Sequence, residues 1–147
     1  MNRKDILDKI QDSLEKNMAE LTQALNDYES ASNFDEGDTL DPEDFSQQAE
    51  FKEMQMRMQI QLDQVNAQLE RLEDLSGKKV STIEAGAIVE TQQNMIFIGV
   101  SFPTIALDGK ELLGITTETP IYASLKGKAK GDSIKLGKEE YTIQAIH

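Results

Sequence analysis

Residues 42–79, PEDFSQQAEFKEMQMRMQIQLDQVNAQLERLEDLSGKK, decide the fold of this 147-residue chain. Gln, Asp and Glu fill most of the stretch, while apolar side chains recur at alternating spacings of three and four residues. These are Phe51, Met54, Met58, Leu62, Val65, Leu69 and Leu72. The pattern predicts one amphipathic helix from Pro42 to Leu75, about 50 Å long at 1.5 Å per residue. A small globular domain does not need a helix of that length, so the sequence predicts a helical rod.

A matching apolar stripe precedes this helix. Residues 4–30 contain neither Pro nor Gly, and their apolar side chains also recur every three or four positions: Ile6, Ile10, Leu14, Met18, Leu21, Leu25 and Tyr28. About a dozen polar residues separate the two predicted helices. We therefore expect the helices to fold back as an antiparallel two-helix coiled coil that buries both stripes. Met54, Met56 and Met58 are interpreted as part of this helix packing.

The pattern changes to β-forming residues after the linker Leu75-Ser-Gly-Lys-Lys. Asp108-Gly109 and Gly137-Lys138 are typical of tight hairpin turns, and Thr119-Pro120 predicts the N-terminus of a short helix ending at Leu125. Strands are predicted at 87–91, 95–100, 104–107, 112–116, 132–136 and 141–146. The fold class is therefore α+β: a helical hairpin over 1–76, then a small antiparallel β-sheet domain with one short helix over 77–147.

The net charge is confined to the helical half. Residues 1–75 carry 7 Lys and Arg against 19 Asp and Glu, whereas residues 76–147 carry eight of each. So acidic a surface argues against direct DNA binding and against docking on an anionic membrane. The chain has no Cys and its sole histidine is His147, which argues against thiol chemistry, a catalytic triad and a multi-histidine metal site. Without an apolar signal or spanning segment, we expect the protein in the cytoplasm.

Acidic residues concentrate in the turn between the helices, at 33–44. No Lys or Arg occurs between Lys16 and Lys52, so neutralising this turn requires a cation or a basic partner. The acids are Asp35, Glu36, Asp38, Asp41, Glu43 and Asp44. Asp41 before Pro42 also fits a helix cap. An EF-hand calcium loop does not fit, because Ser32 and Phe34 would occupy its first and third ligand positions.

This organisation resembles the bacterial Gre-type transcript cleavage factors. The stretch Gly37–Phe45 aligns without gaps to the family's Gly-Asp-x-x-Glu-Asn-x-Glu-Tyr pattern. Residues 119–128, TPIYASLKGK, followed by Gly131-Asp132, are similar to the family's Ser-Pro-hydrophobic…Leu-hydrophobic-Gly-Lys…Gly-Asp segment. The resemblance implies that residues 77–147 form an FKBP-like domain.

The resemblance also implies a function. Such factors are not enzymes themselves: they dock at the secondary channel of RNA polymerase and insert the coiled coil. We expect the chain to be a monomer. Asp38 and Asp41 would then help hold a second Mg²⁺ at the polymerase active site, where backtracked RNA is hydrolysed. The factor would have no cofactor of its own, sharing only this Mg²⁺. The candidate docking residues are Phe102, Tyr122, Lys126 and Lys128.

Several alternatives stay open. The family has Glu and Asn where this chain has Asp41 and Pro42, so a channel-blocking inhibitor without cleavage stimulation is one. A coiled-coil adaptor or holdase is another, although the turn offers a client only Phe34 and Leu40 as apolar groups. A free-standing hydrolase would lack a histidine or a basic clamp. Prolyl isomerase activity is disfavoured by the absence of Trp. The lysines of residues 126–138 are interpreted as a solvated edge or part of a docking face.

Overall fold

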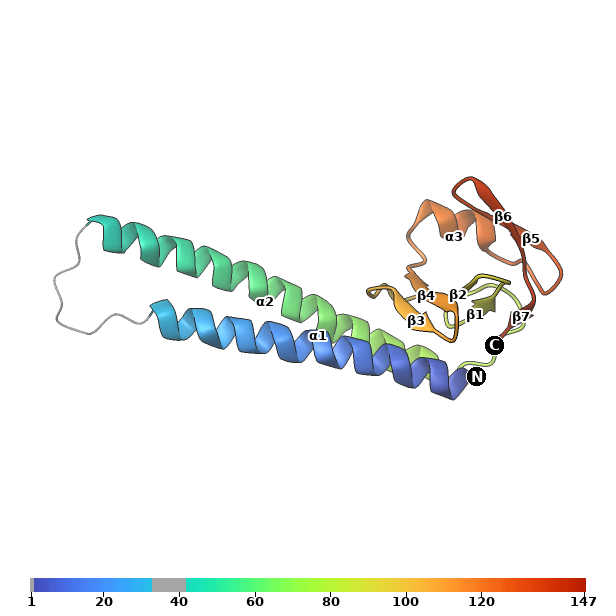
Figure 1. The fold of residues 1–147 in the computed structure, drawn as a ribbon, viewed down its shortest axis with the longest axis horizontal. Coiled ribbons are helices and arrows are strands. Elements are labelled where there is room, and N and C mark those ends of the chain that lie inside the picture. Colours follow the sequence, from blue (N-terminus) through green and yellow to red (C-terminus); the bar gives the residue numbers. More distant parts are fainter. Residues whose placement is uncertain (1, 33–41) are drawn as a thin grey trace. The chain divides into compact units, whose positions relative to one another are not determined.

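A computed structural model describes residues 2–32 and 42–147. Two long helices, α1 (Arg3–Ser32) and α2 (Pro42–Ser76), come first, which confirms both helices predicted from the apolar stripes (Figure 1). By their contacts the residues divide into two compact units. One is Glu15–Ala67; the other combines the chain up to Leu14 with Gln68–His147. Each long helix therefore contributes to both units. The domain limits 1–76 and 77–147 stay a prediction.

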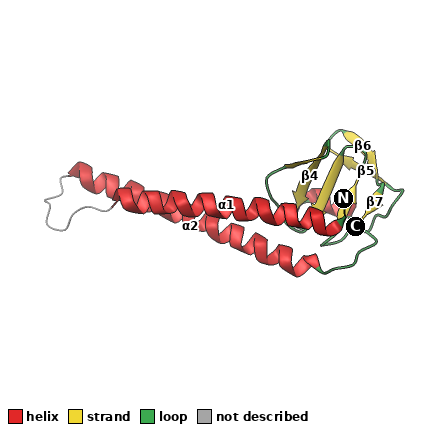
Figure 2. Ribbon diagram, turned by 60° about the horizontal axis from the view of Figure 1, so that its bottom comes forward, coloured by secondary structure: helices red, strands yellow, loops and turns green. Residues whose placement is uncertain are grey.

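In the unit Glu15–Ala67, the two helical segments run antiparallel and side by side (Figures 1 and 2). The rings of Tyr28 and Phe51 meet edge to face, with centroids 6.0 Å apart. Val65 is buried, but most of the stripe is only half-buried, including Met54 and Met58. Partial burial of the stripe is expected for two helices, because each helix covers only one side of the other.

The interpretation of Met56 as helix packing is wrong. Its side chain is 68% exposed, and Ile60, one turn further along α2, is 57% exposed. At about 100° of rotation per residue, positions 56 and 60 lie on the side of α2 opposite the Phe51 and Met58 stripe.

The second unit also buries helical residues: Ile6, Leu7, Ile10 and Leu14 at the start of α1, with Leu72 and Leu75 at the end of α2.

Five of the six predicted strands and the short helix are present in the second unit. A five-stranded sheet has the order β3-β4-β2-β1-β7, and β5 pairs with β6 in a separate hairpin. The bounds are β1 Ile88–Glu90, β2 Asn94–Ile98, β3 Ile105–Leu107, β4 Lys110–Ile115, α3 Pro120–Leu125, β5 Ser133–Leu136, β6 Glu139–Thr142 and β7 Ala145–Ile146. The α+β class, with two long helices followed by a β-rich domain carrying one short helix, is confirmed.

The sheet is mixed rather than antiparallel. After β2 the chain crosses to the sheet edge as β3, and the Asp108-Gly109 turn returns it as β4 between β3 and β2, so β4 runs parallel to β2. Both turn residues have positive φ, 43° and 81°, as the predicted hairpin requires. The single strand predicted over 141–146 is also wrong. The chain leaves the β5–β6 hairpin after Thr142 and joins β1 as β7, because Ile143 is buried between the two pairings.

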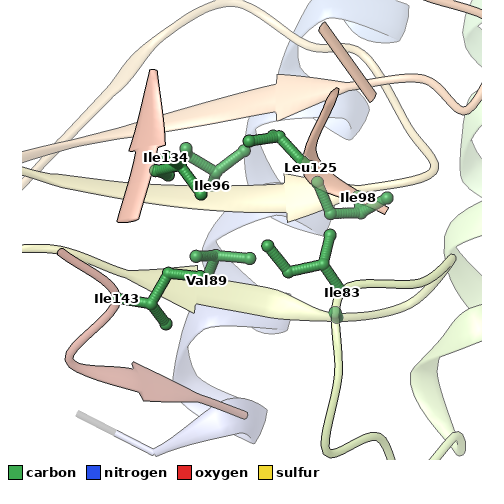
Figure 3. Packing of buried hydrophobic residues seen from close by; sticks show 8 residues of the cluster. Ile83, Val89, Ile96, Ile98, Leu125, Ile134 and Ile143 are labelled. Carbon is green, nitrogen blue, oxygen red and sulfur yellow. The ribbon is translucent and has the colours of Figure 1, made fainter. Parts of the chain in front are cut away.

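One apolar cluster joins both sheets to α3 (Figure 3). Its members come from β1, β2, β5, the end of α3 and the segments beside them: Ile83, Ala87, Val89, Ile96, Ile98, Leu125, Ile134 and Ile143. Each is at most 1% exposed, and burial of a Val, Leu or Ile side chain contributes about 1.5–3 kcal/mol. Thr119 caps α3, as predicted, by accepting a hydrogen bond at Oγ1 from the Tyr122 amide. No helix within residues 2–32 and 42–147 is apolar along enough of its length to cross a bilayer.

Candidate functional site

The two residues predicted to assist a metal ion, Asp38 and Asp41, lie outside the described residues. Their role stays a prediction from the sequence. Glu43, in the first turn of α2, is exposed. Among the residues that the structure does describe, no three His, Asp or Glu side chains gather closely enough to hold a metal ion.

The second unit, formed by the chain up to Leu14 and Gln68–His147, is called the β-rich unit below. The two aromatic docking candidates are held by packing within it. Tyr122, in the first turn of α3, is half-buried against the apolar cluster, and its carbonyl accepts the Lys126 amide at 2.9 Å. Phe102 follows β2 and lies over Gly114 of β4, where a Cβ atom would approach the Phe102 ring to 2.7 Å. The missing side chain at Gly114 thus makes room for this ring. Both aromatic rings have a structural role that is independent of any partner.

The two lysine candidates differ from each other. Lys126 is exposed at the end of α3, whereas Lys128 donates from Nζ to the Ser133 carbonyl at 2.6 Å. Gly127 and Gly131 have φ of 81° and 94°, a conformation that favours glycine. Asp132 accepts the Ala129 amide at 2.9 Å. The Gly-Lys…Gly-Asp pattern therefore forms the turn that leads α3 into β5, and folding alone explains these residue types.

Sequence reasoning did not single out Ile121, which is 43% exposed on α3 next to Tyr122. It lies four residues before the buried Leu125 on the same short helix. No sequence signal separates the two positions, because exposure on a six-residue helix depends on what the sheet covers. Ile121 is therefore an exposed apolar side chain on α3.

A second feature missed by sequence reasoning is the Arg3 guanidinium at the start of α1. It donates to three carbonyl oxygens at 2.6–3.0 Å, and a longer contact of 3.5 Å reaches the Ser76 carbonyl. The three acceptors belong to Leu75, Gly86 and His147. Burial lowers the pKa of Arg3, but a guanidinium stays charged. A cation is unfavourable at a helix N-terminus and favourable at a C-terminus, so Arg3 acts on the end of α2.

A third feature joins β1, β4 and the end of the chain. Glu90 accepts from Lys110 Nζ at 2.9 Å and bonds His147 Nε2 at 3.1 Å. The hydrogen bond with His147, and then that with Lys110, hold the pKa of Glu90 below its usual value. Lys110 also donates to the Thr91 carbonyl at 2.7 Å. Main-chain hydrogen bonds in both directions join His147 to Ile88. The carboxylate of Glu90 thereby ties the last strand to the sheet.

Comparison with known proteins gives one structural likeness. No family model matches the chain, and no curated protein matches it either. The crystal structure of the GreA factor homolog 1 (Gfh1) protein of Thermus thermophilus is 19% identical, with a TM-score of 0.35. The match covers 97% of this chain and 93% of that one. At this identity and score, the two chains share at most a general fold.

Proposed function

We propose that the chain binds bacterial RNA polymerase as a Gre-like regulator, with its helical hairpin entering the secondary channel. The observation that carries the proposal is the antiparallel pairing of α1 and α2 around a connecting segment rich in carboxylates and without a basic residue. Two paired helices that enter a channel together would carry the segment between them into it. The sequence resemblance at 37–45 and 119–132 supports the same proposal.

Charge supports an insertion of this kind. Residues 15–67 carry thirteen Asp and Glu side chains against three Lys and Arg, a formal net charge of −10. An acidic hairpin is attracted to a channel lined by basic groups, and the attraction raises the association rate. The β-rich unit would remain outside the channel, and its exposed side chains Ile121 and Lys126 are candidates for docking.

The proposed chemistry belongs to the polymerase. Mg²⁺ prefers hard oxygen ligands and takes one or two carboxylates from a protein. Asp38 and Asp41 would supply such ligands to a second Mg²⁺ in the polymerase active site, where two metal ions activate water and stabilise the leaving oxygen. The chain would thus stimulate transcript cleavage without being an enzyme.

A channel-blocking inhibitor is the second candidate, and one observation favours it. Helix α2 begins at Pro42, so the preceding position is the one from which a side chain caps the helix. An aspartate at that position is drawn to the free amides of the first turn, and it is one methylene shorter than glutamate. Both effects oppose a role for Asp41 as a metal ligand.

The test uses stalled, backtracked elongation complexes with Mg²⁺. We compare the wild-type protein, the double variant Asp38→Ala/Asp41→Ala and the control Glu20→Ala/Glu50→Ala, which also removes two carboxylates but from exposed helical positions. The proposal expects shortened RNA with the wild type and the control but not with the double variant. Bound wild-type protein that slows elongation without cleavage supports the inhibitor. Absence of polymerase binding overturns both candidates.

A further inference from the structure

An aromatic pair, Tyr28 and Phe51, joins α1 and α2 close to the segment that connects them. The two rings meet edge to face at an interplanar angle of 64°, with their centroids 6.0 Å apart. Tyr28 is the last member of the apolar stripe on α1, and Phe51 is the first member of the stripe on α2. Both side chains are half-buried. Rings in this arrangement attract one another beyond the effect of the area that they bury, so the aromatic pair is a specific contact between the two helices.

The helix turns between the aromatic pair and the connecting segment carry no positive charge. Residues 17–32 of α1 and 42–51 of α2 each contain three Asp and Glu and no Lys or Arg. The first basic residue after them is Lys52. Two packed helices lie about 8–10 Å apart, which is close to the Debye length of about 10 Å in 0.1 M salt. The carboxylates of the two helices therefore repel one another, and this repulsion favours separation of the helix ends.

The end of α1 is the less favourable of the two helix ends. Its last turn includes Glu29 and contains no basic residue, and the helix dipole disfavours an acidic side chain at a C-terminus. Glu43, in contrast, lies in the first turn of α2, where the dipole favours it. Charge thus opposes the last turn of α1, so that packing on α2 has to stabilise it. Tyr28 directly precedes this turn and supplies such packing.

We propose that Tyr28 and Phe51 are a positioning pair. Their contact holds the acidic end of α1 against α2 and thereby sets the distance between the two helix ends that the segment 33–41 connects. The inference rests on the proposed function, in which carboxylates of that segment act at the polymerase active site. A misplacement of about 1 Å can lower a rate about 100-fold, so a loosened hairpin end would lose activity while the rest of the chain still binds.

The distance between the helix ends can be measured because the chain has no native cysteine. Nitroxide labels on Ser30→Cys and Ser46→Cys, both at exposed positions, report this distance by pulsed electron paramagnetic resonance in the full-length protein. We expect a narrow distance distribution with the native pair and with Tyr28→Phe, which keeps the ring. Phe51→Ala should broaden the distribution, and about 1 M salt, where the Debye length is about 3 Å, should narrow it again. The control Leu62→Ala removes another half-buried apolar side chain of α2 and should leave the distribution unchanged.

The unlabelled variants are then compared on backtracked elongation complexes. Phe51→Ala should bind polymerase like wild type but shorten the RNA at least about tenfold more slowly, whereas Tyr28→Phe and Leu62→Ala should act like wild type. For a wild-type protein that blocks elongation instead, the block by Phe51→Ala should weaken at equal binding. Circular dichroism melting verifies that the variants fold, and Tyr28→Ala, which breaks the contact from α1, replaces Phe51→Ala if the latter does not fold.

The distances and the polymerase assay separate the possible failures. A distribution for Phe51→Ala as narrow as that of the native pair overturns the inference, and so does equal broadening by Leu62→Ala. A broadened distribution with unchanged activity at equal binding shows that the aromatic pair does not position the segment. If wild-type protein does not bind polymerase, the proposed function and the positioning role fail together, while the distances still decide whether the pair holds the helix ends.

Discussion

Replacing Arg3 with alanine removes the side chain that ties three segments of the β-rich unit together. The guanidinium donates to the carbonyls of Leu75, Gly86 and His147 at 2.8, 2.6 and 3.0 Å. These acceptors lie 72, 83 and 144 positions along the chain from Arg3. In the variant, the end of α2 loses its cation, the Gly86 carbonyl loses the Arg3 donor, and the His147 carbonyl keeps only the Ile88 amide.

The magnitude follows from the three short bonds. A hydrogen bond to a charged group contributes about 1.5–3 kcal/mol when well shielded. Arg3 is only half-buried, so water replaces part of each bond and about 1 kcal/mol per bond is the better figure. The free energy of unfolding should therefore fall by about 3 kcal/mol. For a chain of this length that corresponds to a melting temperature about 10 °C lower.

The assay is urea and thermal unfolding of Arg3→Ala, Arg3→Lys and the control Lys4→Ala, which removes an exposed charge at the next position. Lysine keeps the charge but lacks the planar fork that reaches several acceptors, so Arg3→Lys should lose more than half of the stabilisation. High salt should change little, because the partners are carbonyl dipoles rather than carboxylates. Arg3→Ala within about 0.5 kcal/mol of Lys4→Ala would refute the reasoning.

Two further predictions concern the same unit. Because the folded-state pKa of Glu90 is lowered, its stabilisation is present above the ordinary carboxyl pKa and is lost as pH falls through the lowered value. Glu90→Gln should therefore be less stable than wild type by roughly 0.5–1 kcal/mol at neutral pH, with the difference vanishing in acid; a constant difference from pH 7 to pH 2 contradicts the ion-pair assignment. Leu125→Ala should cost about 2–5 kcal/mol, whereas Ile121→Ala on the same helix should stay within about 0.5 kcal/mol. Equal losses in denaturant melts would mean that the burial of α3 is misassigned.

The elements of the fold were predictable because each depends on local pattern. Helix α1 begins one residue before its predicted start at residue 4, and α2 ends one residue after its predicted end at Leu75. Thr119-Pro120 predicted the start of α3. Strand pairing was less predictable, since a period of two shows that a strand is half-buried but not which neighbour it has. Tertiary packing determines that β2 and β4 pair in parallel and that the chain passes after Thr142 from the β5–β6 hairpin to β1.

The candidate site was predictable only in part. Asp38 and Asp41 stay predictions, because they lie outside the described residues. The contacts of Arg3 and Glu90 join residues far apart in sequence, which no pattern in a single sequence reveals. A weak signal existed for Arg3, a cation at a helix N-terminus where the dipole disfavours it. Helical rotation alone predicts that Met56 points away from the stripe of Met54 and Met58.

The bond between His147 and Glu90 gives this protein a built-in spectroscopic reporter. No other histidine occurs in the sequence, so every imidazole signal in a spectrum of the protein belongs to His147. The ring contacts β1 through Glu90, while its main-chain carbonyl accepts from Arg3. A change in those signals on adding a partner would report a change near the contact with Glu90, without any label being attached.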